Sequence, residues 1–386
     1  MKTETDLQFT GERVVVDKMD HRPDILIEHM ARYNFAKDFV EGLTVLDAAC
    51  GSGYAKEILN AKEYFGVDVS YEAIKYAVEK YGEGFFVDNL ENPKIPFPFD
   101  AVVSFETIEH LEDPTNFLTW IKNNSKMFVF SIPVNMPSEF HKQVYSIEQI
   151  KELINKHFPH VYFYGQVGDV ISADLINVAQ YVVGVAFTDL PSISIIIPTL
   201  GREEGLQRCL DSINDLNYPE DLIETIILED KPRIGVPKRL KEGVEKSDGE
   251  WIVYASNDIK FFPSSILKSI LSAKQNEKDF VSFNTGIVSE DEGNICEHFM
   301  IKRTLIDSIG GEIFDTDFHH VGVDNLLWAK LKKIGQNFRC EEAIVEHFHW
   351  SKTGEEMDDV YKIAWNEERV REDRELLKTK LEELNK

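Results

Sequence analysis

The amino-acid sequence predicts a two-domain protein of the α/β class. Its 386 residues exceed the ~250 to 300 residues at which a single hydrophobic core stops growing. Short runs of β-branched and aromatic residues alternate with helical stretches, a pattern typical of parallel sheets covered by helices. Pro191 interrupts two strand-like runs at 188–192, so we expect the domain boundary there.

The first region of alternation extends from Leu43 to about Phe187. We expect strands at 44–49, 63–69, 84–89, 99–105, 126–133, 160–167 and 179–187. The last two of these runs are close in the sequence. They are therefore expected to form an antiparallel pair at the end of the sheet.

A second alternating region opens at 192–200, continues through 222–230 and 250–256, and fades near Trp350. The tail from about Glu355 is rich in Glu, Lys and Arg and lacks Gly and Pro, which predicts one long exposed helix. Its apolar residues are expected to pack on the second domain or on another subunit; they are Tyr361, Trp365, Val370, Leu376 and Leu377. The expected domains are 1–190 and 191–352, followed by a charged helix at 353–386.

Composition narrows the class of protein. The formal net charge of −26 argues against a nucleic-acid partner, because phosphate backbones are bound by clustered Lys and Arg. Four scattered cysteines without a C-x-x-C pair favour a reducing cytoplasm. The N-terminus lacks the apolar segment of a signal peptide, and no apolar run approaches the ~18 residues of a membrane span. We expect a cytoplasmic enzyme that contacts a membrane peripherally at most.

The run VLDAACGSGY places a strand, the acid Asp47, and then Gly51 and Gly53 at a turn into an expected helix at 54–60. Glycines let a backbone approach a ligand closely, and a helix N-terminus adds outward-facing N–H groups. A dinucleotide site needs a third glycine where this sequence has Lys56. Nicotinamide cofactors are therefore disfavoured.

The following strands each end in an acid or an amide. These residues are Asp68, Asp88, Asn89 and Glu106. Ligands of open α/β sheets bind at the carboxyl ends of the strands, so we expect these side chains to converge on one crevice. Asp68 can accept hydrogen bonds from two ribose hydroxyls, and Asp88 can accept one from an exocyclic amine. The set fits adenosine without phosphates.

On these motifs, residues 9–188 resemble a class I S-adenosylmethionine-dependent methyltransferase, which implies a Rossmann-like fold. Asp47, Gly51 and Gly53 match its nucleotide motif, with Ala49 where many members have glycine. The resemblance implies that Asp68 binds the ribose and Asp88 the adenine edge. The segments FTGER, IEHLEDP and EFHKQVYSIEQI resemble the subset of these enzymes found with glycan-modifying genes.

Methyl transfer to oxygen needs a base in addition to positioning. His110 and His141 are the candidate imidazoles, with Glu106 and Glu109 as neighbours. In some relatives a Glu-x-x-Glu-His cluster binds a metal, and ETIEH has that spacing. The alternatives are a structural role for each histidine and a solvated acidic helix start at ETIEH.

In EWIVYASNDIKFF a buried strand runs directly into Ser256, Asn257 and Asp258. A carboxylate at this position suits a divalent cation that bridges two phosphate oxygens, because hard cations prefer oxygen ligands. A strand-end aspartate is also a common turn former, so the surrounding motifs must decide.

Residues 192–350 resemble a glycosyltransferase of the GT-A fold, family 2 type. Pro198 and Thr199 match its first strand and turn, and Asp230 matches the acid that accepts from the nucleotide base. Its Asp-x-Asp metal motif aligns with residues 256–258, where only the second aspartate of the motif is present, as Asp258. Because Ser256 replaces the first, metal affinity is expected to be reduced.

The same resemblance places the catalytic base on Asp324 and a late metal-ligand histidine on His347, with His349 as the alternative. Val323 stands where the family usually has an acid. The competing interpretations are a helix N-cap for Asp324 and a pair of exposed edge-strand imidazoles for the histidines.

Cations can also hold the sugar nucleotide. Lys238, Arg239 and Lys241 are candidates, and Arg239 is the one we assign to the donor site. Each of the three can equally belong to a solvated helix face.

Together these observations predict a bifunctional methyltransferase and glycosyltransferase of surface glycan biosynthesis. The implied cofactors are S-adenosylmethionine, a nucleotide-diphosphate sugar, and Mn²⁺ or Mg²⁺. The acceptor is expected to be a glycan or a lipid-linked glycan, and the C-terminal helix is a candidate homo-oligomer contact. Three alternatives stay open. In the first, one domain has lost catalysis, and the substitutions at Ser256 and Val323 point to the glycosyltransferase domain. In the second the methyl acceptor is not a glycan, and in the third the protein is a non-catalytic assembly scaffold.

Overall fold

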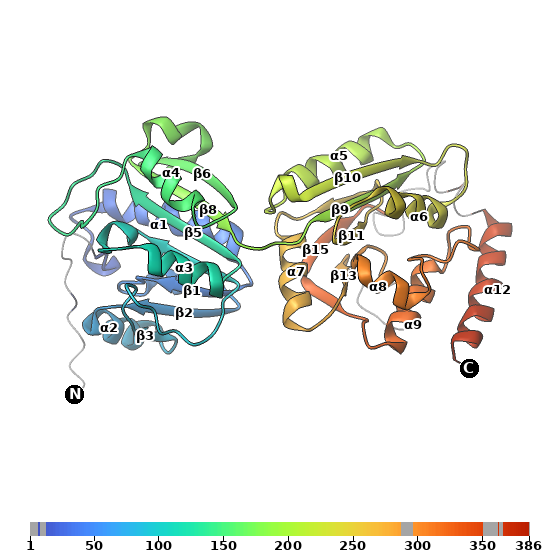
Figure 1. Ribbon diagram of the computed structural model, residues 1–386, viewed down its shortest axis with the longest axis horizontal. Coiled ribbons are helices and arrows are strands. Elements are labelled where there is room, and N and C mark those ends of the chain that lie inside the picture. Colours follow the sequence, from blue (N-terminus) through green and yellow to red (C-terminus); the bar gives the residue numbers. More distant parts are fainter. Residues whose placement is uncertain (1–6, 8–12, 287–295, 350–361, 363–365, 386) are drawn as a thin grey trace. The chain divides into compact units, whose positions relative to one another are not determined.

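The computed structural model describes residues 7, 13–286, 296–349, 362 and 366–385. The chain forms two compact units, Met1–Leu190 (unit 1) and Pro191–Lys386 (unit 2). Each unit is built around its own sheet (Figure 1). The predicted α/β class, with a Rossmann-like first unit, a second α/β unit and a C-terminal helix, is confirmed.

Unit 1 contains an eight-stranded sheet with the order β3-β2-β1-β4-β5-β8-β6-β7. Its strands are β1 (Thr44–Ala48), β2 (Glu63–Asp68), β3 (Phe85–Val87), β4 (Ala101–Phe105), β5 (Met127–Pro133), β6 (His160–Val167), β7 (Val170–Ser172) and β8 (Tyr181–Phe187). The first five in chain order are parallel, and β8 pairs antiparallel with both β5 and β6. The predicted antiparallel pair is thus present, but the short strand β7 forms the edge beyond it.

Helices α1 (Pro23–Val40), α2 (Tyr71–Tyr81), α3 (Thr115–Asn124) and α4 (Ile147–Asn155) surround this sheet, with 3-10 turns η1 (Val16–Lys18), η2 (Tyr54–Glu57), η3 (Ile108–His110) and η4 (Ala173–Val178). Leu46 and Ala48 join the apolar core beneath α3 and α4. Successive strand residues alternate between faces, so Asp47 points the other way, where it meets Tyr33 of α1.

The helix expected at 54–60 is wrong. Only the single 3-10 turn η2 forms there, because Asn60 adopts a left-handed backbone with φ 48° and the chain re-enters the sheet at Glu63. Tyr54 and Ala55 are buried instead of starting a longer helix. The glycine turn is therefore not followed by a helix whose N-terminus can bind an anion.

Unit 2 contains a seven-stranded sheet with the order β10-β9-β11-β14-β13-β15-β12. Its strands are β9 (Ile193–Thr199), β10 (Ile223–Glu229), β11 (Trp251–Tyr254), β12 (Ile259–Phe261), β13 (Phe280–Asn284), β14 (Phe299–Lys302) and β15 (Arg339–His347). β10, β9 and β11 are parallel, whereas β14 runs antiparallel to both of its neighbours. β15 lies between β13 and β12, so the edge-strand interpretation is wrong for His347, whereas His349 lies beyond the end of the strand.

The helices of unit 2 are α5 (Glu203–Asn214), α6 (Val236–Lys246), α7 (Ser265–Gln275), α8 (Arg303–Ile306), α9 (Val323–Lys333) and α12 (Glu367–Leu384), with 3-10 turns η5 (Glu220–Leu222) and η7 (Asp307–Ile309). Leu376, Leu377 and Leu381 of α12 pack against the core of unit 2. Of the two predicted packing partners for the tail helix, Leu376 and Leu377 thus contact the second domain. Tyr361 and Trp365 lie outside the described residues.

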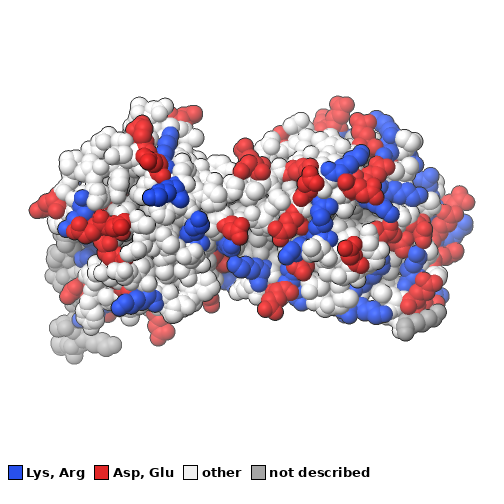
Figure 2. Space-filling view, in the orientation of Figure 1, with Lys and Arg blue, Asp and Glu red and all other residues white. Residues whose placement is uncertain are grey.

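The surface of unit 2 carries both signs of charge. On the face shown in Figure 2, Lys and Arg side chains are interspersed with Asp and Glu. Such mixed surfaces are typical of a solvated exterior. Within the described part of the chain, no helix combines the length and apolar character needed to cross a membrane.

Candidate functional sites in the two units

Asp47 ends up beneath the glycine turn of unit 1, not on its surface. Its carboxylate is fully buried and accepts hydrogen bonds from the hydroxyls of Tyr33 at 3.2 Å and Tyr64 at 2.7 Å. Burial raises the pKa of Asp47 to about 7, because an apolar surrounding disfavours the charged form more than the two hydroxyls favour it. Through these two hydroxyls Asp47 joins β1 to α1 and to β2.

The turn itself requires both glycines. Gly51 and Gly53 have φ values of 55° and 82°, in the left-handed region. A Cβ on Gly53 would lie 2.7 Å from the Ala77 Cβ and 2.7 Å from the Phe85 ring, so this position also lacks room for a side chain. The close approach of backbone to helix and strand explains why the motif ends in glycine.

Asp68 fixes the geometry of this cradle at the end of β2. Its carboxylate accepts hydrogen bonds from the Gly51 N–H at 3.0 Å and the Ser70 N–H at 2.8 Å, and the Arg13 guanidinium lies 3.9 Å away. The Asp88 N–H donates to the Asp68 carbonyl at 3.2 Å, so the ends of β2 and β3 are adjacent. The expected convergence at the carboxyl edge is present for these residues.

Asp88 and Asn89 organise the loop after β3. Asp88 accepts hydrogen bonds from the N–H groups of Asn89 and Lys94, both at 2.8 Å. The Asn89 side chain accepts from the Glu91 N–H at 3.0 Å. Both residues lie at the predicted edge, and their contact with an adenine ring stays a prediction.

Glu106 follows β4 with a left-handed φ of 49°. Its carboxylate pairs with the Arg32 guanidinium and with His29 Nε2 at 3.0 Å. Burial alone would raise the pKa of Glu106, but the charges of Arg32 and His29 outweigh it and lower the pKa to about 2. The carboxylate therefore stays ionised, and the residues that neutralise it come from α1.

Sequence reasoning missed Arg32 and His29. Arg32 is fully buried, donates to Gln166 Oε1 at 2.9 Å, and lies 4.5 Å from the centre of the Tyr181 ring. His29 Nδ1 lies 3.1 Å from the Tyr54 hydroxyl. The i, i+3 spacing of the two residues, which places them on one helix face, was the available signal.

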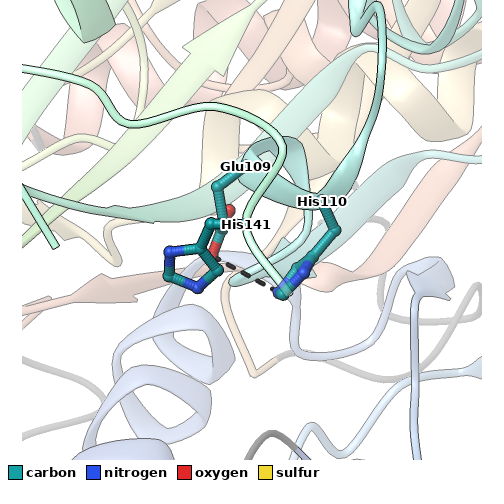
Figure 3. A group of neighbouring side chains, drawn as sticks. All are labelled: Glu109, His110 and His141. Atoms are coloured by element: carbon teal, nitrogen blue, oxygen red, sulfur yellow. Dashed lines mark ion pairs between the residues drawn. The ribbon is translucent and has the colours of Figure 1, made fainter. Parts of the chain in front are cut away.

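Glu109, His110 and His141 form a second cluster in unit 1 (Figure 3). One potential ligand atom from each lies within 4.8 Å of the others, and His110 Nε2 is 4.0 Å from Glu109 Oε1. The Glu109 carboxylate is buried, whereas both imidazoles are partly exposed. The structure thus brings both predicted imidazoles together with Glu109, while Glu106 of the ETIEH motif is held by α1 instead.

Backbone carbonyls fix the tautomer of both imidazoles. His110 Nδ1 lies 3.1 Å from the Phe140 carbonyl, and His141 Nδ1 lies 2.7 Å from the Met136 carbonyl. Since a carbonyl only accepts, Nδ1 must carry the proton in each ring. In the neutral form of each ring, Nε2 has a lone pair that can accept a proton from a substrate or bind a cation.

Asp258 is the centre of the candidate site in unit 2. It is nearly buried and accepts a hydrogen bond from the Ser256 hydroxyl. The Arg202 guanidinium lies 3.2 Å from its Oδ2, and His347 Nε2 lies 3.6 Å from its Oδ1. The predicted metal ligands Asp258 and His347 are therefore neighbours, and the Asp258 carboxylate is paired with the Arg202 guanidinium.

His298 completes this site and was missed by sequence reasoning. The potential ligand atoms of Asp258, His298 and His347 all lie within 4.8 Å of one another. His298 comes directly before β14, which pairs with β11, so sheet pairing carries it to the end of the Trp251–Tyr254 strand. The only signal was a Glu-His pair, Glu297-His298, at the start of a strongly apolar run.

Two carboxylates surround His347. Its Nδ1 lies 3.1 Å from Glu297, opposite the contact of Nε2 with Asp258. Burial lowers the pKa of His347, but hydrogen bonds to Asp258 and Glu297 outweigh burial and raise it. A carboxylate on the second nitrogen is also the arrangement that orients metal-bound imidazoles. The rings of His347 and His349 are 5.4 Å apart, so the alternative ligand is close by.

Residues from β9 support the Asp258 loop. The Asn257 side chain donates to Thr199 Oγ1 at 2.7 Å, which ties the loop to the end of β9. Pro198 is buried within β9, so it shapes the strand end and does not face solvent. Thr199 is the member of the predicted pair that contacts the site.

Asp230 and Arg239 belong to one buried arrangement. Asp230 accepts hydrogen bonds from the Ile234 N–H at 2.8 Å and from Arg239 Nε at 3.1 Å. Arg239 also pairs with Glu242 at 2.8 Å, so its guanidinium supports the loop after β10. Contacts of either residue with a nucleotide stay predictions.

Lys238 and Lys241 do not share this burial. Lys238 is exposed, and Lys241 Nζ lies 3.5 Å from the Glu312 carboxylate.

Asp324 is the second residue of α9, whose N-cap is Gly322, so the N-cap interpretation of Asp324 is wrong. Burial raises the pKa of Asp324 to about 6, and the charge of Glu297 adds to the increase. The Cys296 thiol donates a hydrogen bond to the Asp324 carbonyl at 3.1 Å, and Cys296 lies two residues before His298. The start of α9 therefore lies next to the segment that carries His298.

Comparison with known proteins identifies the first region. Residues 20–173 match the family model described as a methyltransferase domain. A probable S-adenosylmethionine-dependent methyltransferase of Mycobacterium tuberculosis is 29% identical over 117 residues, which are 29% of this chain and 42% of that protein. A mitochondrial ubiquinone biosynthesis O-methyltransferase of Dictyostelium discoideum is 28% identical over 116 residues, 24% and 36% of the two chains. The chain thus spans less than half the length of these curated relatives.

Solved structures show only partial likeness. A TehB-like SAM-dependent methyltransferase from Corynebacterium glutamicum is 16% identical, with a TM-score of 0.35, over 42% of this chain and 88% of that one. A mannosyltransferase from Pyrobaculum calidifontis, solved with GDP-Man and Mn²⁺, is 17% identical, with a TM-score of 0.35, over 42% and 57%. On the family match, the N-terminal region of the chain contains a methyltransferase domain.

Proposed function

We propose that the protein is a bifunctional cytoplasmic enzyme of surface glycan biosynthesis. Unit 1 transfers a methyl group from S-adenosylmethionine, and unit 2 transfers a sugar from a nucleotide-diphosphate donor. The family match supports the methyltransferase half. The observation that carries the second half is the convergence of Asp258, His298 and His347 at the end of β11, with the Asp324 carbonyl bonded to the nearby Cys296 thiol.

In unit 1 the cofactor would lie along the glycine turn, with its ribose on Asp68. Bound S-adenosylmethionine would supply the methyl group and would leave as S-adenosylhomocysteine. His110 or His141 would accept the proton of the acceptor hydroxyl at Nε2. Both imidazoles are held in the tautomer that this step requires.

In unit 2 the residues fit a divalent cation, because two imidazoles and a carboxylate converge with a carboxylate behind His347. A bound Mn²⁺ or Mg²⁺ supplies positive charge to the diphosphate leaving group. Arg202 must release Asp258 for the carboxylate to bind a cation fully. Asp324 takes the proton of the acceptor hydroxyl as the new glycosidic bond forms, and the nucleoside diphosphate departs with inversion.

A single chain raises the effective concentration of one product at the other site. The proposed acceptor is a glycan or a lipid-linked glycan. No nucleic-acid partner is proposed for the protein. Only peripheral contact with a membrane is proposed. The C-terminal helix, which already packs within unit 2, is the candidate contact between copies of the chain.

The test is thermal stabilisation of the purified chain by S-adenosylhomocysteine and by UDP, GDP, dTDP and CDP, each with and without Mn²⁺. A ligand that binds only the native state raises the melting temperature by mass action. Shifts with S-adenosylhomocysteine and with one diphosphate in a Mn²⁺-dependent manner are expected. No shift with any diphosphate would remove the support for sugar transfer.

A second candidate function is a methyltransferase that carries an inactive glycan- or nucleotide-binding domain. The pairing of Arg202 with Asp258, and Ser256 in place of an acid, favour it. Asp324→Asn separates the two, because an inactive domain loses no product when the base is removed. A pure scaffold, the third alternative, is excluded by any transfer of label from S-adenosylmethionine, and the methylated product reveals whether the acceptor is a glycan.

A further inference from the structure

Asp373 of the C-terminal helix binds a loop of the candidate sugar-transfer site. Its side chain is only 1% exposed. Oδ1 accepts a hydrogen bond from the His319 N–H, and Oδ2 accepts from the N–H groups of His320 and Val321, all at 2.8 Å. Three consecutive backbone donors are thus satisfied by one carboxylate 52 to 54 residues away in the sequence.

This loop leads directly into the candidate base. Gly322 follows Val321 with a φ of 81° and is the N-cap of α9, in which Asp324 is the second residue. A Cβ on Gly322 would lie 2.9 Å from Leu377 Cδ2, so α12 packs directly against this glycine. The direction in which α9 starts is therefore set by contacts with α12 on both sides of Val321.

Other contacts hold α12 in place. Leu376, Leu377 and Leu381 join the core of unit 2. Lys380 Nζ pairs with Asp315 at 2.7 Å, and Lys333 Nζ donates to the Leu384 carbonyl at 2.6 Å. The helix is thus fixed to the segment that precedes the loop and to the end of α9.

We propose that Asp373 is a positioning residue for sugar transfer, and that α12 is a working part of the glycosyltransferase site. The role rests on the proposed function of unit 2, because it acts through Asp324. When three part-buried N–H groups lose the carboxylate that accepts from them, the loop must rearrange to find other partners. A displacement of about 1 Å at a reacting group can cost roughly 100-fold in rate.

The experiment compares Asp373→Ala, Asp373→Asn and the neighbouring control Glu372→Gln in the full-length chain. Glu372 is exposed and pairs with the His319 ring, so it probes the same loop without the backbone bonds. We expect kcat for sugar transfer to fall roughly 10- to 100-fold in Asp373→Ala. Asp373→Asn should fall less, because an amide keeps one acceptor oxygen, and Glu372→Gln should stay within about twofold.

Two readouts separate positioning from loss of folding. The affinity for the nucleoside diphosphate should stay within about twofold in every variant, because the donor contacts lie on other segments. Methyl transfer by unit 1 in the same molecules should be unchanged, since each unit has its own core. If Asp373→Ala is too unstable to measure, Asp373→Asn alone carries the comparison.

The outcomes distinguish the two proposals. A wild-type chain that transfers no sugar from any donor contradicts the proposed function, and the positioning role falls with it. An active chain in which Asp373→Ala and Asp373→Asn keep the wild-type kcat overturns the positioning role alone. A parallel loss of diphosphate affinity and kcat also overturns it, because that pattern indicates a general disturbance of unit 2.

Discussion

The Arg202 guanidinium pairs with the Asp258 carboxylate across 3.2 Å, and both side chains are largely shielded from solvent. Arg202 has a left-handed backbone with φ 64° at the N-cap of α5, where the chain turns toward Asp258. An arginine and a metal ion compete for the same carboxylate oxygens. The affinity of the site for a cation is therefore governed by how readily this pair separates.

The first prediction concerns this competition. Arg202→Gln should increase the affinity of unit 2 for Mn²⁺ by about tenfold, since one charge-assisted hydrogen bond no longer has to break. Calorimetric titration with Mn²⁺ alone measures the change. Arg22→Gln, which breaks an exposed pair with Asp24 in unit 1, is the control and should have no effect. Equal affinity in the Arg202 variant and the wild type contradicts the competition.

The second prediction concerns the buried pair between Arg32 and Glu106. Arg32→Met should lower the free energy of unfolding by about 3 to 5 kcal/mol, because it leaves a carboxylate without its main charge partner. Urea unfolding monitored in unit 1 measures the loss. The exposed Arg22–Asp24 pair again supplies the control, with an expected effect below about 1 kcal/mol.

The pH dependence gives an independent check on Arg32→Met. Because the pKa of Glu106 is lowered to about 2 in the folded state, its contribution is present above the ordinary glutamate range and is lost as the pH falls toward 2. The variant and the wild type should therefore converge in stability at acid pH. A difference that stays constant from pH 7 to pH 3 would rule out an electrostatic origin.

The third prediction compares two glycines with positive φ. Gly53 and Gly82 have φ values of 82° and 81° and ψ values of 8° and −160°, and of the two only Gly53 lacks space for a Cβ. Gly82→Ala should cost roughly 1 to 3 kcal/mol from backbone strain alone. Gly53→Ala should cost roughly 2 to 4 kcal/mol because overpacking is added. It should also abolish the thermal shift with S-adenosylhomocysteine, which Gly82→Ala should retain.

The fourth prediction concerns the ionisation of Asp324. Since burial raises its pKa to about 6, the rate of sugar transfer should increase as the pH rises through about 6 and the carboxylate becomes ionised. Asp324→Asn should reduce kcat by about 100- to 10,000-fold and remove this limb of the profile. Methyl transfer in the same variant is the internal control. A pH profile that is flat between 5 and 7 would speak against Asp324 as the base.

The strands β1 to β6 and β8 to β11 were predictable because their apolar runs are rich in β-branched and aromatic residues, whereas no ranges were predicted for β7 and β12 to β15. The absence of a long helix after Gly53 was not predictable. The residues there have helical propensity, but the left-handed Asn60 and the early return at Glu63 are set by tertiary packing. Local pattern gave the turn correctly and the element after it incorrectly.

The candidate sites divide in the same way. Asp68 and Asp258 were predictable because Asp68 ends β2 and Asp258 lies in the short turn between β11 and β12. His298 and Arg32 were not, because they reach their sites by pairing of β14 with β11 and by packing of α1. Asp373 lies in a helix that the sequence described only as charged and exposed. Contacts between distant segments carry no local signature, so they emerge only with the fold.

The carbonyls that hold the two imidazoles of unit 1 come from one short loop. Met136 and Phe140 of that loop, and Val144 just beyond it, expose 36 to 47% of their surface. The segment with these exposed apolar side chains is thus also the segment that decides which nitrogen of each imidazole carries the proton. Under the proposed function, a substitution in this loop would change acceptor selection and imidazole reactivity together.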